Sequence, residues 1–227
     1  MSGRDRIRKI IALLRKAYGK APRFKLTNPV DELIRTVLSQ NTSDTNSLKA
    51  YGALKRAFKS WEDLLFASTR HVASVIRHGG LAKIKAERIK AILREIDSRE
   101  SRISLGRLRS LTTQEGLAYL RSLKGVGPKT SSCVMLFSFG RPAMPVDTHI
   151  FRVAKRLGFL KQNIDIAAAH EVLTKRVPQD LIYEFHLGII EHGRRTCKAQ
   201  NPRCGACVLF KICHFKDKRR YCADQKS

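Results

Sequence analysis

The sequence has no apolar run long enough to cross a membrane, and its start, MSGRDRIRKI, lacks the apolar stretch of a signal peptide. Internal repeats and low-complexity linkers are absent as well. We therefore expect a protein with no membrane partner that is intracellular and not secreted. In a reducing compartment, clustered cysteines usually bind metal instead of forming disulfides. Hydrophobic residues make up 43% of the 227 residues, which is enough for a globular core.

Acidic residues are scarce. Nineteen Asp and Glu stand against forty-five Lys and Arg, which gives a formal charge of +26. A polyanionic partner is the leading physical explanation, because each phosphate that a basic side chain neutralises releases a condensed counterion. Charge alone also fits a ribosome-type protein, a membrane-surface protein or the basic surface of a thermophile. It favours nucleic acid without saying which one.

Alternating apolar and polar runs bounded by turn residues are also absent, so we expect little or no sheet. Apolar residues recur instead at helical spacing, first in Ile7, Ile10, Ile11 and Leu14, and again in Leu33, Ile34, Val37 and Leu38. Capping boxes at 60–63 (SWED) and 112–115 (TTQE) predict the starts of two short helices. Further helical patterns cover residues 69–78, 82–98, 128–138, 148–157, 165–176 and 179–192. The sequence predicts an all-α protein of many short helices.

Four cysteines stand at the spacing C-x6-C-x2-C-x5-C: Cys197, Cys204, Cys207 and Cys213. Four thiolates so close in sequence can close on one metal centre, either zinc or an iron–sulfur cluster. Structural zinc usually joins two tight C-x2-C pairs, and only one pair here is tight. A disulfide framework is the remaining alternative. Cys133 and Cys222 lie outside this group, and we expect an ordinary buried thiol and a tail thiol.

The stretch LKGVGPKT contains a turn built on Gly125, Val126 and Gly127, followed by a proline suited to the first turn of a helix. Amides exposed at such a helix start can hold a DNA phosphate without reading sequence, although a ligand-free turn has the same pattern. Lys129 comes next. The helix dipole and partial burial would favour its neutral amine, which can attack a sugar C1′ and form a Schiff base. Nearby phosphates would oppose this.

Asp147, in PVDTHIFR, stands where an N-cap would open the helix that follows. Capping alone would explain an aspartate at this position. A carboxylate there can also stabilise oxocarbenium-like charge on deoxyribose and help to deprotonate an attacking amine. The two roles are compatible.

Three stretches, LKGVGPKTSS, PVDTHIFRV and HGRRTCKAQNPRCGACVLFKIC, together resemble the endonuclease III family in order and spacing, and the resemblance covers roughly residues 5–220. It implies that Lys129 and Asp147 are catalytic and that the four cysteines hold one [4Fe–4S] cluster. Relatives with serine or tyrosine in place of the lysine resemble monofunctional glycosylases. Lysine implies a bifunctional glycosylase with β-elimination lyase activity.

The resemblance also implies residues that bind or enter DNA. Leu81, in GLAKIKAE, stands in the family's intercalating loop, which makes it a candidate wedge, although a core leucine at a helix start fits equally well. Where the family usually has a gap-filling Gln, this chain has Asn41, with Gln40 beside it. Lys198 and Arg203 lie between Cys197 and Cys204, the first two of these cysteines, and we expect both to bind DNA phosphates.

By resemblance, the fold is a two-lobed helix–hairpin–helix DNA glycosylase with a C-terminal iron–sulfur cluster loop. We expect a six-helix barrel lobe over residues 24–132, which includes the helix–hairpin–helix at about 113–135. Residues 1–23 and 133–227 would form the second lobe, with the cluster loop at 197–213.

The expected function is a bifunctional DNA glycosylase/AP lyase of base excision repair. It would act as a monomer on double-stranded DNA with a flipped base, remove oxidised pyrimidines and cut 3′ to the abasic site. One alternative is a monofunctional uracil or thymine mismatch glycosylase, in which Asp147 would activate water. Others are a non-catalytic DNA-binding iron–sulfur protein and a zinc protein without a cluster.

Overall fold

The computed structural model describes residues 2–223, and throughout this range all regular structure is helical, with no strand. The prediction of an all-α protein is confirmed. The chain divides into two compact units. One unit runs from Leu26 to Arg141; the other combines the chain up to Lys25 with the chain from Pro142 onward. None of the helices in the described range is long and apolar enough to cross a membrane.

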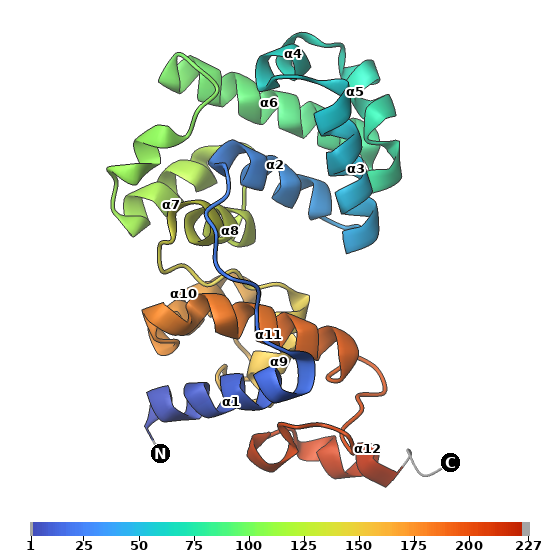
Figure 1. Cartoon of the computed structure of the whole chain (residues 1–227), viewed down its shortest axis with the longest axis vertical. Helices are drawn as coiled ribbons and strands as arrows, with labels where there is room; N and C mark the ends of the chain where they lie inside the picture. The colour runs from blue at the N-terminus through green and yellow to red at the C-terminus, as the bar shows by residue number, and fades with distance from the viewer. Residues whose placement is uncertain (1, 224–227) are drawn as a thin grey trace. The chain divides into compact units, whose positions relative to one another are not determined.

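The Leu26–Arg141 unit contains nine helical segments (Figure 1): α2 (Pro29–Ser39), α3 (Asp44–Ala57), α4 (Trp61–Phe66), α5 (Thr69–Val75), η1 (Arg77–Gly79), α6 (Ala82–Glu100), η2 (Gly106–Arg109), α7 (Thr113–Ser122) and α8 (Pro128–Phe139). Both predicted capping boxes are present, at the starts of α4 and α7. The pattern over 69–78 is divided between α5 and η1. The helix α3 was not predicted, because few of its residues are apolar and buried, chiefly Ala50 and Leu54.

The second unit contains α1 (Gly3–Tyr18), α9 (Thr148–Arg156), α10 (Ile166–Arg176), η3 (Gln179–Leu181), α11 (Ile182–Arg195), η4 (Phe210–Ile212), η5 (Lys216–Arg219) and α12 (Arg220–Ala223). The helix α11 packs against both α1 and α9. The four isoleucines and leucines predicted for the first helix are its buried residues. Phe159 and Phe185 meet edge to face with centroids 5.8 Å apart, a contact that adds about 0.5–1.5 kcal/mol beyond area burial.

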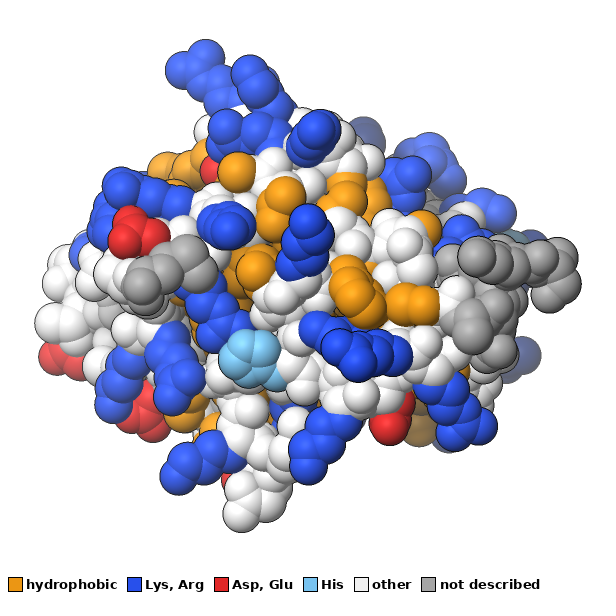
Figure 2. All heavy atoms as spheres, turned by 90° about the horizontal axis from the view of Figure 1, so that it is seen from below, with side chains coloured by type: hydrophobic (Ala, Val, Ile, Leu, Met, Phe, Trp, Pro, Cys, Tyr) orange, Lys and Arg blue, Asp and Glu red, His pale blue; other side chains and the backbone are white. Residues whose placement is uncertain are grey.

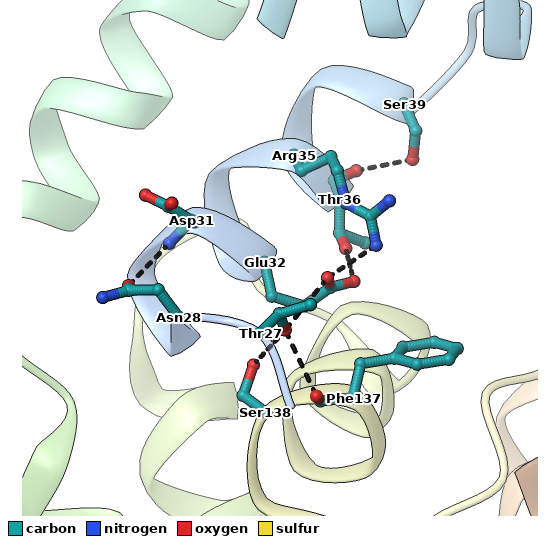
Figure 3. A network of polar contacts seen from close by, with 9 residues as sticks. All are labelled: Thr27, Asn28, Asp31, Glu32, Arg35, Thr36, Ser39, Phe137 and Ser138. Carbon is teal, nitrogen blue, oxygen red and sulfur yellow. Dashed lines mark hydrogen bonds and ion pairs between the residues drawn. The ribbon is translucent and has the colours of Figure 1, made fainter. Parts of the chain in front are cut away.

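The helix α8 is the most enclosed element of the Leu26–Arg141 unit, with eight of its twelve residues buried. It packs against α2 and α7. Figure 3 shows how polar contacts fasten it to the start of α2: the Thr27 amide donates to the Phe137 carbonyl at 2.9 Å, and the Thr27 and Ser138 hydroxyls lie 2.9 Å apart. Nearby, the buried Glu32 carboxylate accepts from Arg35 at 2.6 Å. The helix is therefore held at its C-terminal end by side chains as well as by packing.

The division between units differs from the one expected from the resemblance. The expected boundary at residue 132 falls inside α8, whereas the compact units divide after Arg141. Gly116 shows why α8 stays with α7: a Cβ at this glycine would lie 2.7 Å from the Met135 methyl carbon, so the two helices approach closely. The whole helix–hairpin–helix thus belongs to one unit.

Candidate functional site

The hairpin between α7 and α8 is a tight turn stabilised by its own backbone. The Val126 amide donates to the Leu123 carbonyl at 3.0 Å, and Gly125, the third residue of this turn, has φ +85°. A positive φ at the third position is what a type II turn requires, and glycine adopts it without strain. Gly127 is the N-cap of α8 and Pro128 occupies its first turn, as predicted. Val126 is buried and anchors the hairpin to its unit.

The hairpin and the first turn of α8 present main-chain amides. The first four N–H groups of an α-helix have no partner within the helix, and the helix dipole adds partial positive charge there. Arg121 on α7 donates to the Ser131 hydroxyl at 3.3 Å, and this hydroxyl donates to the Pro128 carbonyl at 3.0 Å. The α7 side of the motif therefore fixes the helix start that would bind an anion.

Lys129 is half-buried in the first turn of α8, directly after the hairpin. Its neighbour Thr130 is buried, and the Thr130 hydroxyl accepts from the Gln40 carboxamide nitrogen at 3.4 Å. One turn further, burial raises the pKa of the Cys133 thiol to about 12, so Cys133 is the inert buried thiol that the sequence predicted. Lys129 is thus the amine that lies at this helix start.

Asp147 caps α9, as predicted: its Oδ1 accepts from the Ile150 amide at 2.8 Å. The buried segment before it is held by two helices. The Met144 amide donates to the Thr174 hydroxyl at 2.9 Å, and His170 Nδ1 lies 3.0 Å from the Met144 carbonyl. His186 Nδ1 lies 3.1 Å from the Pro145 carbonyl. The Asp147 carboxylate is thereby fixed by its own helix, and the backbone before it is fixed by α10 and α11.

The four predicted ligand cysteines line one common cavity, together with apolar residues such as Val153, Leu157 and Leu209. Within residues 2–223, however, no three His, Cys, Asp or Glu side chains are grouped so that they could hold a single metal ion. Four sulfurs spread around one cavity suit a larger group, and a [4Fe–4S] cluster is held by four Cys thiolates. The donor set thus fits the cluster better than it fits a zinc ion, and the cysteines form no disulfide.

Burial governs the chemistry of these thiols. It raises the pKa of Cys207 to about 12 and also raises the pKa of Cys204 and Cys213, and charge on neighbouring cysteines adds to each shift. Four mutually repelling thiolates require a compensating positive charge. Metal ions supply that charge and displace the protons.

Two arginines of α9 fasten the cysteine loop to the rest of its unit. Arg152 donates to the Cys197 carbonyl at 2.9 Å and to the Gly193 carbonyl at 2.9 Å. Arg156 donates to the Lys198 carbonyl at 2.8 Å and lies 3.3 Å from Cys197 Sγ. The helix that Asp147 opens therefore also holds the start of the cysteine loop at Cys197.

His192, near the end of α11, adds a third support for the loop. Its Nε2 lies 3.7 Å from Cys207 Sγ, and its Nδ1 lies 2.8 Å from the Tyr18 hydroxyl. That hydroxyl also lies 2.7 Å from the Thr196 hydroxyl. Burial lowers the pKa of His192 to about 4, so its imidazole is neutral at physiological pH. No pattern in the sequence indicates His192, Arg152 or Arg156, because their partners are brought near only by folding.

Of the residues predicted to enter DNA, Asn41 and Leu81 lie on the surface and Gln40 is half-buried. Asn41 and Leu81 are exposed and have positive φ, +52° and +49°. Gln40 is half-buried, and its carboxamide oxygen accepts from Arg88 while its nitrogen donates to Thr130. Asn41 is therefore better placed than Gln40 to meet a ligand.

Lys198 and Arg203 are both exposed on the cysteine loop. Figure 2 shows a face of the molecule on which Lys and Arg side chains far outnumber Asp and Glu. Lys129 and Asp147, in contrast, belong to different units. The described residues thus form two groups of candidate residues: the hairpin with Lys129, and Asp147 with the cysteine loop.

The fold and these residues define a helix–hairpin–helix protein of DNA base excision. Residues 34–179 match the model of the HhH-GPD superfamily base excision DNA repair protein, and residues 197–213 match the iron–sulfur binding domain of endonuclease III. A putative DNA glycosylase of Arabidopsis thaliana is 38% identical over 171 residues, which are 74% of this chain and 58% of that relative. The chain thus spans little more than half the length of that relative.

Endonuclease III of Thermotoga maritima is 36% identical over 208 residues, which are 91% of this chain and 93% of that protein. Among solved structures, a trapped endonuclease III–DNA covalent intermediate matches with a TM-score of 0.80 and 28% identity, covering 97% of this chain and 98% of that one. The chain belongs to the endonuclease III family of base excision repair DNA glycosylases. The family resemblance and the [4Fe–4S] cofactor expected from the sequence are confirmed.

Proposed function

We propose that this chain removes oxidised pyrimidines from double-stranded DNA and cuts the strand 3′ to the resulting abasic site, with Lys129 as nucleophile. The observation that carries the proposal is the position of Lys129, half-buried in the first turn of α8 directly after the hairpin. A DNA-binding protein without catalysis needs the hairpin and the charge but not a lysine at this point. The matched structure of a trapped covalent endonuclease III–DNA intermediate supports the same chemistry.

In the proposed reaction, Lys129 Nζ attacks the sugar C1′ and the bond from C1′ to the base breaks. The base leaves with the bonding electron pair and takes up a proton. The attached amine then loses a proton and the C1′–O4′ bond breaks, so that O4′ takes up a proton and the opened sugar is held as a protonated Schiff base. Loss of a proton from C2′ then expels the 3′ phosphate, which cuts the strand. Asp147 would stabilise the positive charge that develops on the sugar as the base departs.

Binding requires contacts to the phosphates and a way to extrude the nucleotide. The amides of the Gly125–Gly127 turn and of the start of α8 would hold a backbone phosphate. Lys198 and Arg203, exposed on the cysteine loop, would bind further phosphates. Leu81 and Asn41 would enter the duplex where the flipped base leaves a gap. One protomer carries all of these groups, so we propose a monomer.

When bound, the [4Fe–4S] cluster supplies iron–thiolate bonds that close the loop from Cys197 to Cys213. The side chains of this chain do the rest. Arg152 and Arg156 hold the loop backbone, and His192 faces Cys207. This arrangement displays Lys198 and Arg203 on a fixed support.

Borohydride trapping tests the proposal. Reduction of the Schiff base on a duplex with thymine glycol converts it to a stable amine, so wild-type protein should form a covalent complex with DNA. The variant Lys129→Gln should form none, and Asp147→Asn should slow base release by about 10²–10⁴-fold. Lys124→Gln, which removes an exposed lysine of the same hairpin, is the matched control and should still trap.

Other outcomes assign other functions. Base release without any covalent complex would make the protein a monofunctional glycosylase in which Asp147 activates water. DNA binding without base release would make it a non-catalytic iron–sulfur protein. A complex that survives Lys129→Gln would assign the nucleophile to another amine. Duplexes with uracil, a G·T mismatch or a plain abasic site would then define the range of lesions.

A further inference from the structure

Lys85 is one of the most deeply buried charged residues of the described chain, with 2% of its surface exposed. Its ammonium donates to two main-chain carbonyls, Leu38 O at 2.7 Å and Gly79 O at 2.7 Å. Desolvation, together with the nearby Arg88 charge, lowers the pKa of Lys85. A lysine buried at such a cost, and not used by the proposed chemistry, requires an explanation.

The two carbonyls that Lys85 binds belong to the C-terminal ends of two helices. Leu38 is in the last turn of α2, and Gly79 is the last residue of η1. Carbonyls at a helix end have no partner within the helix, and the dipole of α2 adds partial negative charge at its C-terminal end. One ammonium therefore satisfies both ends and joins two segments that are 41 residues apart in sequence (Leu38 and Gly79).

Each of these carbonyls comes shortly before an exposed residue with positive φ. Leu38 leads into Asn41, and Gly79 leads into Leu81, a residue that is 52% exposed. The two turns lie side by side, since a Cβ at Gly80 would be only 3.9 Å from the Thr42 hydroxyl. Lys85 thus binds the backbone just before each of the two residues proposed to enter DNA.

Positive φ costs a residue other than glycine on the order of 1–3 kcal/mol unless the surroundings enforce it. For leucine, which gains nothing from a local side-chain hydrogen bond, this conformation must be held from outside. An exposed apolar side chain in such a conformation is placed for contact with a ligand and not for packing. The Lys85 hydrogen bond at Gly79 anchors the turn that holds Leu81 in this state.

We propose that Lys85 is a positioning residue that fastens the turn at residues 40–43 to the turn at residues 79–82, so that Asn41 and Leu81 enter the duplex as one rigid pair. This inference rests on the proposed function. Lysine is suited to the task because its flexible stem spans apolar surroundings and its three N–H donors can serve several carbonyls. An apolar residue of similar length would fill the space but leave both carbonyls unbound.

The chain offers a matched control in Lys90, one and a half turns further along α6. Lys90 is also buried, with 5% exposed, and its ammonium also donates to a main-chain carbonyl, that of Ala67. Ala67 is the C-cap of α4 and belongs to neither turn. Lys85→Met and Lys90→Met therefore make the same chemical change on one helix, and only the first releases the two turns.

The test compares excision of thymine glycol from a duplex with excision from a single strand, where no base pair or stacked partner must be displaced. Under single-turnover conditions, the excision rate of Lys85→Met should fall about tenfold or more on the duplex, because small misplacements of binding groups slow a reaction by such factors. On the single strand the rate should fall less than about threefold. A 2-aminopurine opposite the lesion should report correspondingly slower unstacking. Lys90→Met should keep the wild-type ratio of duplex to single-strand rates, whatever its thermal stability.

Equal losses on both substrates, or the same altered ratio in Lys90→Met, would overturn the role of Lys85. If Lys85→Met does not fold, Lys85→Gln, which keeps a donor for one carbonyl, should show the same change of ratio at smaller size, and an unchanged ratio would again overturn it. Borohydride trapping of wild-type protein on the duplex reports Lys129 separately. Absence of trapping there would contradict the proposed function, whereas intact trapping with an unchanged ratio in Lys85→Met would contradict only the positioning role.

Discussion

Irregular backbone is held in place in two different ways in this protein. One way applies to the hairpin and its neighbouring turns, and the other to the cysteine loop. In the Leu26–Arg141 unit, the hairpin is held by the packing of α7 against α8, and the turns at Asn41 and Leu81 are held by the buried donor Lys85. In the other unit, the chain from Thr196 to Leu209 runs through turns and bends without a helix. It is held by arginines and by four sulfurs around one cavity.

The difference follows from how much apolar surface each segment can bury. Both ends of the hairpin continue into helices that pack into a core, so the turn itself is short and needs only one glycine with positive φ. In the cysteine loop only Pro202 and Leu209 are buried between residues 196 and 213. A segment with so small a core requires metal bonds for its stability. The four predictions that follow test this contrast.

The largest effect is expected for Cys207→Ser, which removes the most buried of the cluster-lining thiols that burial perturbs. Structural metal centres contribute folding free energy outright, about 10–16 kcal/mol for zinc in small domains, so loss of one ligand should release the loop. Hydrogen exchange measured by mass spectrometry should show fast exchange from residue 197 to 219. Peptides from α2 and α8 should stay protected, and equal loss of protection there would show that the hairpin also depends on the cluster.

Gly125→Ala should produce the largest effect in the hairpin. A Cβ would lie 2.6 Å from Arg88 Nε and 2.7 Å from its Cδ, and φ is +85°. We expect a loss of about 1–3 kcal/mol in unfolding free energy and weaker binding to an abasic duplex, because Arg88 must shift away from Gln40. Gly3→Ala, at an open position in α1, is the control. Unchanged urea midpoints for Gly125→Ala would contradict the rigid hairpin.

The same contrast explains what could be predicted from the sequence. The N-cap role of Asp147 and the cysteine spacing are local, and both were readable because their partners lie within a few residues. Lys85 bonds to a carbonyl 47 residues away, and Arg156 bonds to one 42 residues away, so neither contact has a local signal. One hint was present: Lys85 interrupts the apolar stripe of its helix beside Ala86 and Ile89.

Arg156→Ala should weaken the cysteine loop without touching a ligand. It removes donors to the carbonyls of Lys198 and Ala199 and a contact with the ring of Phe215. Both carbonyls are exposed to water, so the loss of each hydrogen bond should cost about 0.5–1.5 kcal/mol. The visible absorption of the cluster should therefore decay faster under a chelator than in wild-type protein, while exchange at α8 stays the same. Arg194→Ala, an exposed change on α11, is the comparison, and equal decay in both would remove Arg156 from the support of the loop.

The smallest effect expected is a difference in pH response between two tyrosines, one in each unit. Burial and a hydrogen bond to Glu100 at 2.9 Å raise the pKa of Tyr119 to about 12, from an ordinary value of 10.0. Because the folded pKa lies above the unfolded one, the contribution of the protonated phenol is complete below about pH 10 and is lost as pH rises to about 12. Tyr119→Phe should therefore be less stable than wild-type at pH 8, by about 1 kcal/mol, and the deficit should shrink towards pH 12.

Tyr183, in the other unit, donates instead to a neutral carbonyl, that of Pro22, at 3.1 Å, and burial raises its pKa as well. The acceptor of this hydrogen bond carries no charge, so ionisation of the Tyr183 phenol would not place two negative charges together here. The stability deficit of Tyr183→Phe relative to wild-type should therefore shrink less between pH 8 and pH 12. Urea midpoints of wild-type and both variants at several pH values measure the difference. A Tyr119→Phe deficit that does not change between pH 10 and 12 would mean that the Glu100 contact does not hold the phenol protonated. The polar contacts of the hairpin unit would then matter less than its packing.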